Sequence, residues 1–213
     1  MQRPPRVYPR AFSLVELLVV VAIISVLTGL SVSSLNLWRA QALTSSGNRM
    51  ADLVALARQN SVGKNTYTAI AIKTQNESAY SAVCLLEYVR SDDGSSGQWK
   101  MFTPWTTLKD GVVFTSDASN TFLNSSGTLP DNFPAQIPYR GQSANVSSMA
   151  VQVYQPDGTL SAGQMLRLRL VEGVASASGN AVTLTHPAAS GQPANYYDIV
   201  VVRDSGQVKV ERL

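Results

Sequence analysis

At 213 residues and 45% hydrophobic content, the chain is long enough for one ordinary domain plus an extension, and apolar enough for a real core. This composition excludes a chain that is disordered throughout. The net charge is +3, but three arginines precede the first hydrophobic run, and without them 14 basic residues balance 14 acidic ones. The positive charge is therefore that of an N-terminal leader, and nucleic acid is not an expected partner.

The single cysteine, Cys84, and the single histidine, His186, leave little room for catalytic or metal chemistry. One cysteine cannot form an intramolecular disulfide, and we expect Cys84 to be a small buried side chain. The sequence contains no phosphate-binding glycine loop, paired metal ligands or histidine-based catalytic pair. Asp92-Asp93-Gly94 suits a turn better than a calcium site. We therefore expect no enzymatic activity, no cofactor and no metal.

The N-terminal segment combines a basic start with a long apolar run. No charged side chain occurs in the 22 residues from Leu17 to Trp38, and about 20 residues are enough to cross a bilayer. Because the arginines precede this run, the N-terminus should stay in the cytoplasm while the rest is exported. The pattern predicts a single-pass membrane helix. A secretory signal peptide, cut after small residues such as Ser31 and Ser33, is the alternative.

Glu16 is an unusual residue for such an apolar stretch. A carboxylate costs about 2.5 to 3.5 kcal/mol at the centre of a bilayer, and a disposable export signal gains nothing from that cost. The helical neighbours three and four residues away offer no partner; they are Phe12, Ser13, Val19 and Val20. We therefore expect the partner of Glu16 to come from another molecule.

Residues Ala11 to Ile24, AFSLVELLVVVAII, resemble the prepilin-type N-terminal motif of type IV pilins and type II secretion pseudopilins. The resemblance implies that a membrane prepilin peptidase cuts between Ala11, where the family usually has Gly, and Phe12, which is then N-methylated. Glu16 becomes the fifth residue of the mature chain, the place of the family's glutamate. Its implied partner is the amine of Phe12 on a neighbouring subunit, and the pair would set the register between packed helices.

The same resemblance implies a minor pilin or pseudopilin, a structural subunit that assembles through its N-terminal helix into a type IV pilus or type II secretion pseudopilus. Its partners would be other pilin or pseudopilin subunits, the prepilin peptidase/methyltransferase and the inner-membrane assembly platform. It would start as a single-pass protein of the bacterial inner membrane, with a periplasmic or extracellular C-terminal domain. The alternative is a membrane-anchored extracytoplasmic binding module that does not polymerise; an anchored enzyme is the weakest candidate.

Residues 38–64 predict an amphipathic helix that continues the apolar one. Apolar side chains recur at helical offsets, at Met50, Leu53, Val54 and Ala57. No proline interrupts the segment, so one helix can run from Phe12 to about Val62, with Ser45-Ser46-Gly47 as its expected weak point. The family resemblance implies that the second half of this helix packs on a sheet.

From Thr66 on, short β-rich runs alternate with turn residues. The expected strands are Tyr67–Ile72, Tyr80–Val89, Trp99–Phe102, Val112–Phe114, Met149–Tyr154, Met165–Val171, Ala181–Thr185, Tyr197–Arg203 and Gln207–Glu211, the last two forming a hairpin. The expected fold class is α+β, with the long helix packed on a C-terminal antiparallel sheet domain, as in pilins.

The domain organisation follows from these segments. We expect a removed basic leader at 1–11, a transmembrane and filament-core helix at 12–37, the amphipathic helix at 38–64 and an exported β-rich domain at 65–213, with a long surface loop at about 116–148. The segment RMADLVALARQNSVGKN and the ending YYDIVVVRDSGQVKVERL resemble the minor pseudopilin H and FimT-like group.

Overall fold

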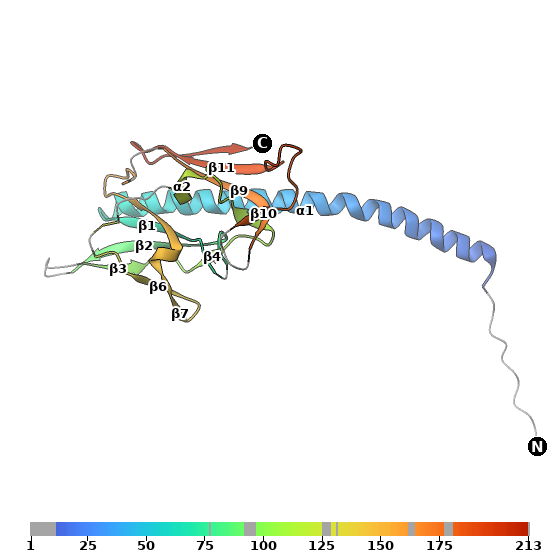
Figure 1. Ribbon diagram of the computed structural model, residues 1–213, viewed down its shortest axis with the longest axis horizontal. Coiled ribbons are helices and arrows are strands. Elements are labelled where there is room, and N and C mark those ends of the chain that lie inside the picture. Colours follow the sequence, from blue (N-terminus) through green and yellow to red (C-terminus); the bar gives the residue numbers. More distant parts are fainter. Residues whose placement is uncertain are drawn as a thin grey trace, which may run out of the picture. The chain divides into compact units, whose positions relative to one another are not determined.

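The computed structural model describes residues 12–76, 78–91, 97–124, 129–130, 132–161, 165–176 and 181–212, with the side chains of 30–37 left undescribed. The chain forms two compact units, Met1–Trp38 and Arg39–Leu213. Helix α1, Leu14–Gly63, contributes to both (Figure 1). Its bounds agree closely with the helix expected from Phe12 to about Val62.

The second unit is built mainly from β-strands, as the turn-separated apolar runs predict. Two further helical turns are short, α2 at Thr121–Asn124 and the 3-10 helix η1 at Val146–Ser148. The strands are β1 (Thr68–Lys73), β2 (Ala82–Arg90), β3 (Gly97–Met101), β4 (Thr106–Thr107), β5 (Val112–Phe114), β6 (Gln136–Tyr139), β7 (Gln142–Asn145), β8 (Met149–Tyr154), β9 (Leu166–Ala175), β10 (Val182–Leu184), β11 (Tyr196–Val201) and β12 (Val208–Arg212).

The strands form two antiparallel sheets and a separate hairpin. The first sheet has the order β3-β2-β1-β8, with β4 also paired to β2. The second has the order β10-β9-β11-β12, with β5 paired to β9, and β6 pairs with β7 in a two-stranded sheet. The predicted C-terminal hairpin is present as the antiparallel pair β11–β12. The predicted fold class, a long helix with antiparallel sheets, is confirmed.

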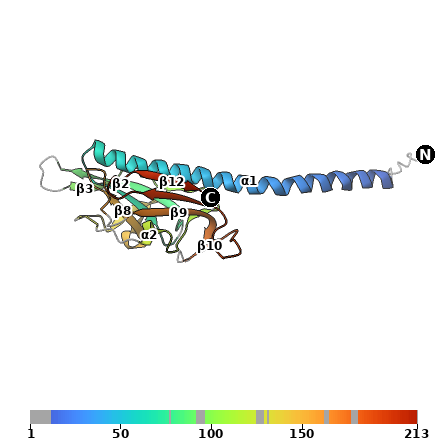
Figure 2. The same cartoon turned by 90° about the horizontal axis from the view of Figure 1, so that it is seen from above.

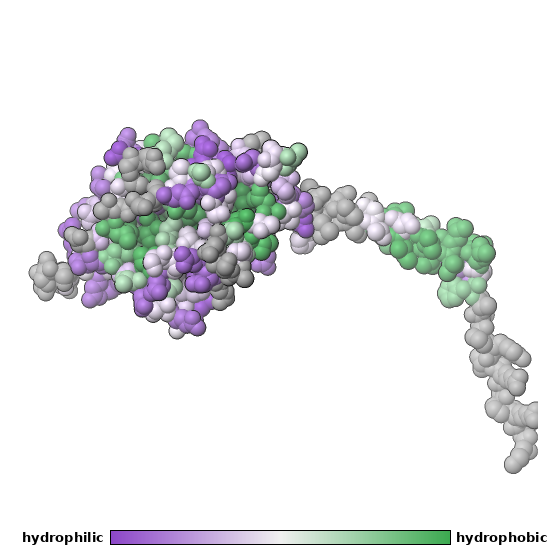
Figure 3. Space-filling view, in the orientation of Figure 1, coloured by the Kyte–Doolittle hydropathy of each residue, from purple (hydrophilic) through white to green (hydrophobic). Residues whose placement is uncertain are grey.

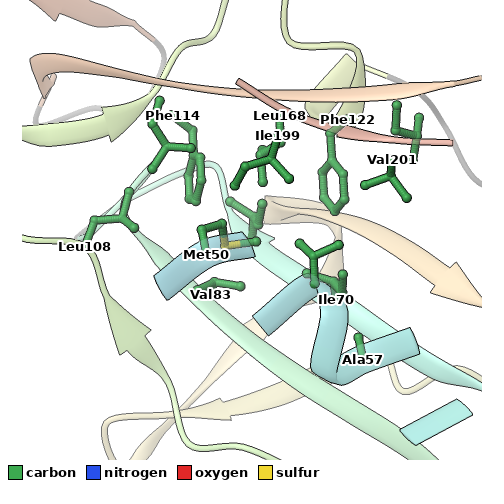
Figure 4. Close-up of a cluster of buried hydrophobic side chains, with 14 of the residues drawn as sticks. Met50, Ala57, Ile70, Val83, Leu108, Phe114, Phe122, Leu168, Ile199 and Val201 are labelled. Atoms are coloured by element: carbon green, nitrogen blue, oxygen red, sulfur yellow. The ribbon is translucent and has the colours of Figure 1, made fainter. Parts of the chain in front are cut away.

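The main core of the second unit lies between the C-terminal half of α1 and the two sheets (Figures 1 and 2). Met50, Val54 and Ala57 of α1 are fully buried there, at the helical offsets that the sequence shows. Figure 4 shows Met50 and Ala57 beside side chains from both sheets, among them Ile70, Val83, Leu168 and Ile199. The amphipathic pattern of residues 38–64 therefore corresponds to a helix face that packs on strands.

Strand β1 is buried on both of its faces. Ile70 and Ile72 belong to the main core, while the alternate residues Ala69 and Ala71 belong to a second apolar cluster. Ile137 of β6 is completely buried in that second cluster. Because successive side chains of a strand point to opposite faces, the Ala-Ile-Ala-Ile sequence places small residues under the β6–β7 hairpin and large ones under α1.

The expectation of one long surface loop at 116–148 is corrected by these contacts. Phe122 of α2 is 1% exposed and lies in the main core, and the segment also contains the β6–β7 hairpin. Residues 125–128 and Asp131 lie outside the described part. Phe122 belongs to the short pair Phe122-Leu123 and Ile137 stands between Gln136 and Pro138, so neither is part of a helical or strand-like periodic pattern.

The expected weak point at Ser45-Ser46-Gly47 lies inside the continuous helix α1. Ser46 is buried, and its Oγ accepts a hydrogen bond of 3.2 Å from the backbone N–H of Lys109. Small residues at this point let the helix approach the strands closely, so they serve packing rather than weaken the helix.

Candidate assembly site on the N-terminal helix

Helix α1 begins with a capping box formed by Ser13 and Glu16. The backbone N–H and the hydroxyl of Ser13 donate to Glu16 Oε2 at 2.9 and 3.0 Å, and the backbone N–H of Glu16 donates to Ser13 Oγ at 3.2 Å. These bonds satisfy backbone donors that the first turn of a helix otherwise leaves free. The negative charge also lies at the positive end of the helix dipole.

The expectation that Glu16 has no partner in its own chain is therefore wrong. Ser13 stands three residues before it and is the partner. The Ser-x-x-Glu spacing of a capping box was the signal that could have found this contact. Ser13 carries no charge, however, and no cation pairs with Glu16 among the residues that the structure describes.

The helix that follows Glu16 is apolar on all sides and uncovered. Between 46% and 80% of each large apolar side chain is exposed at Leu14, Val15, Leu17, Leu18, Val19, Val20, Val21, Ile23, Ile24, Val26 and Leu27. Figure 3 shows this stretch as an almost unbroken apolar surface on the face in view. A helix that is apolar all round is stable only when lipid or other protein surrounds it.

Two hydroxyl groups interrupt this apolar stretch without requiring water. Ser25 Oγ donates to the carbonyl of Val21 at 2.8 Å, and Thr28 Oγ1 donates to the carbonyl of Ile24 at 2.7 Å. Because each hydroxyl bonds to its own helix four residues back, it carries little unsatisfied polarity into an apolar environment. Glu16 thus remains the one ionisable group between Phe12 and Gly29.

The predicted site residues are only partly brought together. Phe12 lies just before the helix with 78% of its surface exposed, and Glu16 is exposed in the first turn. Ala11, the other side of the predicted cut, lies outside the described residues. In the uncut chain the nitrogen of Phe12 is a peptide nitrogen, so the amine expected to neutralise Glu16 can exist only after the cut.

Among the residues that the structure describes, no helix is both long and apolar enough to cross a membrane.

The second unit offers little reactive chemistry among its described residues. Burial raises the pKa of the Cys84 thiol far above its usual range, and this cysteine is a free, buried side chain, as expected. His186 lies with Nε2 3.2 Å from Nη1 of Arg39 and Nδ1 3.6 Å from a carboxylate oxygen of Glu172. No group of three or more possible metal ligands occurs in the described part, which does not include Asp92-Asp93-Gly94.

The basic residues near the C-terminus have contacts within the domain. Arg203 lies 3.8 Å from Asp204, and Lys209 donates to Glu211 at 2.9 Å. Arg212 donates to Asn48 Oδ1 at 3.0 Å, and its guanidinium lies 4.9 Å from the centre of the Tyr197 ring. These side chains are engaged on their own surface, which does not favour phosphate binding.

Comparison with known proteins is informative mainly at the N-terminus. Residues 8–32 match the family described as the prokaryotic N-terminal methylation motif. Two solved structures of the minor pseudopilin EpsH from the type II secretion system of Vibrio cholerae resemble the chain. One has 9% identity and a TM-score of 0.42 over 80% of this chain and 97% of that one. The other has 12% identity and a TM-score of 0.41 over 80% and 96%.

No curated protein matches the chain by sequence. The matched motif spans the predicted cut and Glu16, so the predicted prepilin-type motif is confirmed. The chain thus carries a prepilin-type N-terminal methylation motif on a fold of one long helix and two antiparallel sheets, and together these support a subunit of the pilin or pseudopilin type.

Proposed function

We propose that this chain is a minor pilin or pseudopilin whose mature form begins at Phe12 and which assembles through the N-terminal part of α1. The observation that supports this most directly is a helix apolar on every side with one carboxylate, Glu16, in its first turn. Such a surface needs an apolar environment, and the carboxylate needs a positive partner when that environment excludes water. Parallel copies of the same helix would supply both.

Before assembly, the same helix would anchor the subunit in the bacterial inner membrane. This part of the proposal rests on the sequence, in which the 22 residues from Leu17 to Trp38 carry no charge, including residues 30–37 whose side chains are not described. The arginines before the run favour a cytoplasmic N-terminus and an exported C-terminal domain. The prepilin peptidase/methyltransferase and the assembly platform of the membrane would act on this form.

The cut before Phe12 would change the electrostatics of the helix start. It would create an amine, charged at neutral pH, four residues from Glu16 in the sequence. In a filament the amine of one subunit would neutralise the carboxylate of its neighbour, and a helix shifted by one turn would leave both charges unpaired. The pair would thereby select a single axial register.

An anchored binding module that does not polymerise is the second candidate. It explains the apolar helix equally well, but in it Glu16 would only cap its own helix through Ser13, and its carboxylate would weaken a simple anchor. The two candidates differ in the expected N-terminus. Only the assembling subunit requires a cut before Phe12 and a free amine there.

The test is mass spectrometry of the protein purified from its native membrane. We expect a mature chain that begins at Phe12 and carries one additional methyl group on its terminal nitrogen. The same gene expressed in a host without a prepilin peptidase should yield the full leader and serves as control. An N-terminus at Met1 in the native host, or one downstream of Ser34, would contradict the proposal.

A further inference from the structure

A small pocket of the second unit lies beside Arg39, the first residue of that unit. Its volume is about 250 Å³, and its walls come from α1, from the turn before β5 and from the neighbouring ends of β9 and β10. Its lining includes Arg39, Ala42, Asp110, Glu172 and Val174. Because these segments are far apart in the sequence, only the fold brings the charged side chains together.

Hydrogen bonds fix the walls of this pocket. The backbone N–H of Lys109 donates to Ser46 Oγ at 3.2 Å, which ties the turn that carries Asp110 to α1. The backbone N–H of Thr185 donates to the carbonyl of Glu172 at 3.1 Å, which continues the pairing of β10 with β9. The charged residues of the pocket are therefore held on elements that are bonded to one another.

The imidazole of His186 stands between a cation and a carboxylate at this pocket. Nη1 of Arg39 lies 3.2 Å from Nε2 of His186, and Nδ1 of the same ring lies 3.6 Å from Oε2 of Glu172. A guanidinium can only donate hydrogen bonds, so Nε2 is the acceptor and carries no proton. In this arrangement the imidazole is neutral, and it does not compensate the charge of Glu172.

The carboxylate of Glu172 has no charged partner among the residues that the structure describes. Its side chain is only 12% exposed, and 3.6 Å to the imidazole is longer than a hydrogen bond. Carboxylates with so little exposure are normally paired, because losing water without a replacement is costly. Asp110 lines the same pocket and forms no ion pair with the described residues either. The pocket thus offers two carboxylates to a cationic group.

Arg39 supplies a positive group on the other side of the imidazole. It is exposed and forms no ion pair with the described part of the chain. One of its nitrogens contacts His186, which leaves other N–H groups for an acceptor. Guanidinium groups bind phosphate through paired N–H donors. A ligand that matches the pocket therefore carries a phosphate and an ammonium close together.

The place of Arg39 in the chain indicates where such a ligand would come from. Arg39 directly follows the uncharged run Leu17 to Trp38, which we propose to cross the inner membrane. About 20 helical residues cross the apolar core of a bilayer, so the residue after this run lies among the lipid headgroups. Val174, with 62% of its surface exposed, and Ala42 give the pocket an apolar border. The position favours a phospholipid over a soluble ligand.

We propose that this pocket binds the headgroup of a zwitterionic phospholipid with a primary amine, with the phosphate at Arg39 and the ammonium at Glu172 and Asp110. Phosphatidylethanolamine has this order of charges. Such binding would hold the exported domain at the membrane surface before assembly. The inference rests on the membrane-anchored form proposed above but not on the cut before Phe12, so the two proposals can fail separately.

The test is native mass spectrometry of the full-length chain in detergent, with equal amounts of phosphatidylethanolamine, phosphatidylcholine and phosphatidylglycerol that carry the same acyl chains. We expect phosphatidylethanolamine to bind at least tenfold more tightly than phosphatidylglycerol, which has no ammonium group. It should bind about threefold more tightly than phosphatidylcholine, whose ammonium cannot donate a hydrogen bond. Equal binding of the three lipids would overturn the proposal.

Soluble competitors distinguish a lipid headgroup from a lysine side chain of a partner protein. Glycerophosphoethanolamine carries both charged groups and should displace the bound phosphatidylethanolamine. The n-butylammonium ion, which resembles a lysine side chain, should require at least a tenfold higher concentration, because it has no phosphate for Arg39. Equal displacement by the two compounds would assign the pocket to a partner's lysine and overturn the lipid assignment.

Variants locate the site. Glu172→Gln should lower the affinity for phosphatidylethanolamine about tenfold and leave that for phosphatidylglycerol unchanged, whereas Arg39→Gln should weaken both. Asp52→Asn and Arg49→Gln, which remove exposed charges elsewhere on α1, are the matched controls and should bind like the parent. Unchanged lipid preference in Glu172→Gln, with thermal unfolding like that of the parent, would contradict the assignment.

Discussion

A Cβ atom added to Gly47 of α1 would lie 2.4 Å from Cγ of Tyr197 on β11. The helix backbone therefore touches the tyrosine ring directly. On the next residue of the helix, Asn48 Oδ1 accepts hydrogen bonds from the Tyr197 hydroxyl at 2.7 Å and from Arg212 at 3.0 Å. The helix and the last two strands of the chain are thus joined by one close packing contact and one shared acceptor.

Gly47→Ala should destabilise the domain in spite of the better helix propensity of alanine. That propensity is worth about 1 kcal/mol, but a methyl group 2.4 Å from a fixed ring forces a shift that costs about 1 to 3 kcal/mol. We expect a lower midpoint in urea unfolding, followed by near-UV circular dichroism. Gly63→Ala is the matched control, because nothing lies within 4 Å of its added Cβ. An equal fall of the urea midpoint in both variants would contradict the packing explanation.

Asp198→Asn should lower the free energy of unfolding more than its control, Asp204→Asn. Asp198 is 1% exposed and accepts two hydrogen bonds from Arg169, of 2.8 Å from Nε and 2.7 Å from Nη2. The hydrogen bond to Asp198 raises the pKa of Arg169 and outweighs the effect of burial, so the arginine stays charged. Removing the carboxylate charge breaks this buried pair, and also the contact of 3.7 Å between Asp198 and Arg167, at a cost of about 3 to 5 kcal/mol.

The control for this variant is Asp204→Asn. Asp204 also lies near an arginine, Arg203, at 3.8 Å, but its side chain is 91% exposed. Exposed ion pairs contribute about 0 to 1 kcal/mol, so the free energy of unfolding should hardly change. A similarly small effect in Asp198→Asn would contradict the expected contribution of the buried pair to stability.

The stability of the domain should fall in mild acid, partly through Glu87. Burial raises the pKa of Glu87, but hydrogen bonds from Lys64 and Asn60, with the charges of Lys64 and Lys100, bring it below its usual value of 4.5. A carboxyl group with a lowered pKa in the folded state stabilises that state above pH 4.5. This contribution is lost as the pH falls through the folded-state pKa.

Unfolding in urea between pH 7 and pH 3 measures this effect. The free energy of unfolding should decrease below about pH 4.5, the usual pKa of the group, and the decrease should be smaller in Glu87→Gln. Glu211→Gln is a comparison on the last strand: a hydrogen bond from Lys209 also lowers the pKa of Glu211, but this pair is exposed, so the acid loss should change less than in Glu87→Gln. A Glu87→Gln variant with the full acid loss of the parent would rule out a contribution from this group.

Patterns of neighbouring residues in the sequence were enough to predict the long helix and several of the strands. Strands β5 and β8 have the predicted bounds, because each is a short apolar run between turn residues. Residues 116–148 were misjudged because single apolar residues there find their partners on distant strands. Glu16 was identified from the sequence because a carboxylate is unusual within an apolar stretch.

Glu16→Ala should separate assembly from membrane insertion. The substitution removes a charge from the apolar helix, so insertion should be unchanged or improved. In the assembled state it would leave the amine of Phe12 without its counter-charge. We therefore expect at least a tenfold fall in the amount of subunit recovered in sheared filaments, with carbonate-resistant membrane association unchanged.

Ser13→Ala is the control that distinguishes assembly from helix capping. It removes the hydroxyl that bonds to Glu16 but keeps the backbone N–H bond of 2.9 Å and the carboxylate. Loss of a serine cap costs about 1 kcal/mol at a helix start, so Ser13→Ala should assemble at close to the parent level. If Ser13→Ala and Glu16→Ala reduce assembly to the same extent, Glu16 acts by capping its own helix. If only Glu16→Ala fails, its carboxylate is needed by a neighbouring subunit.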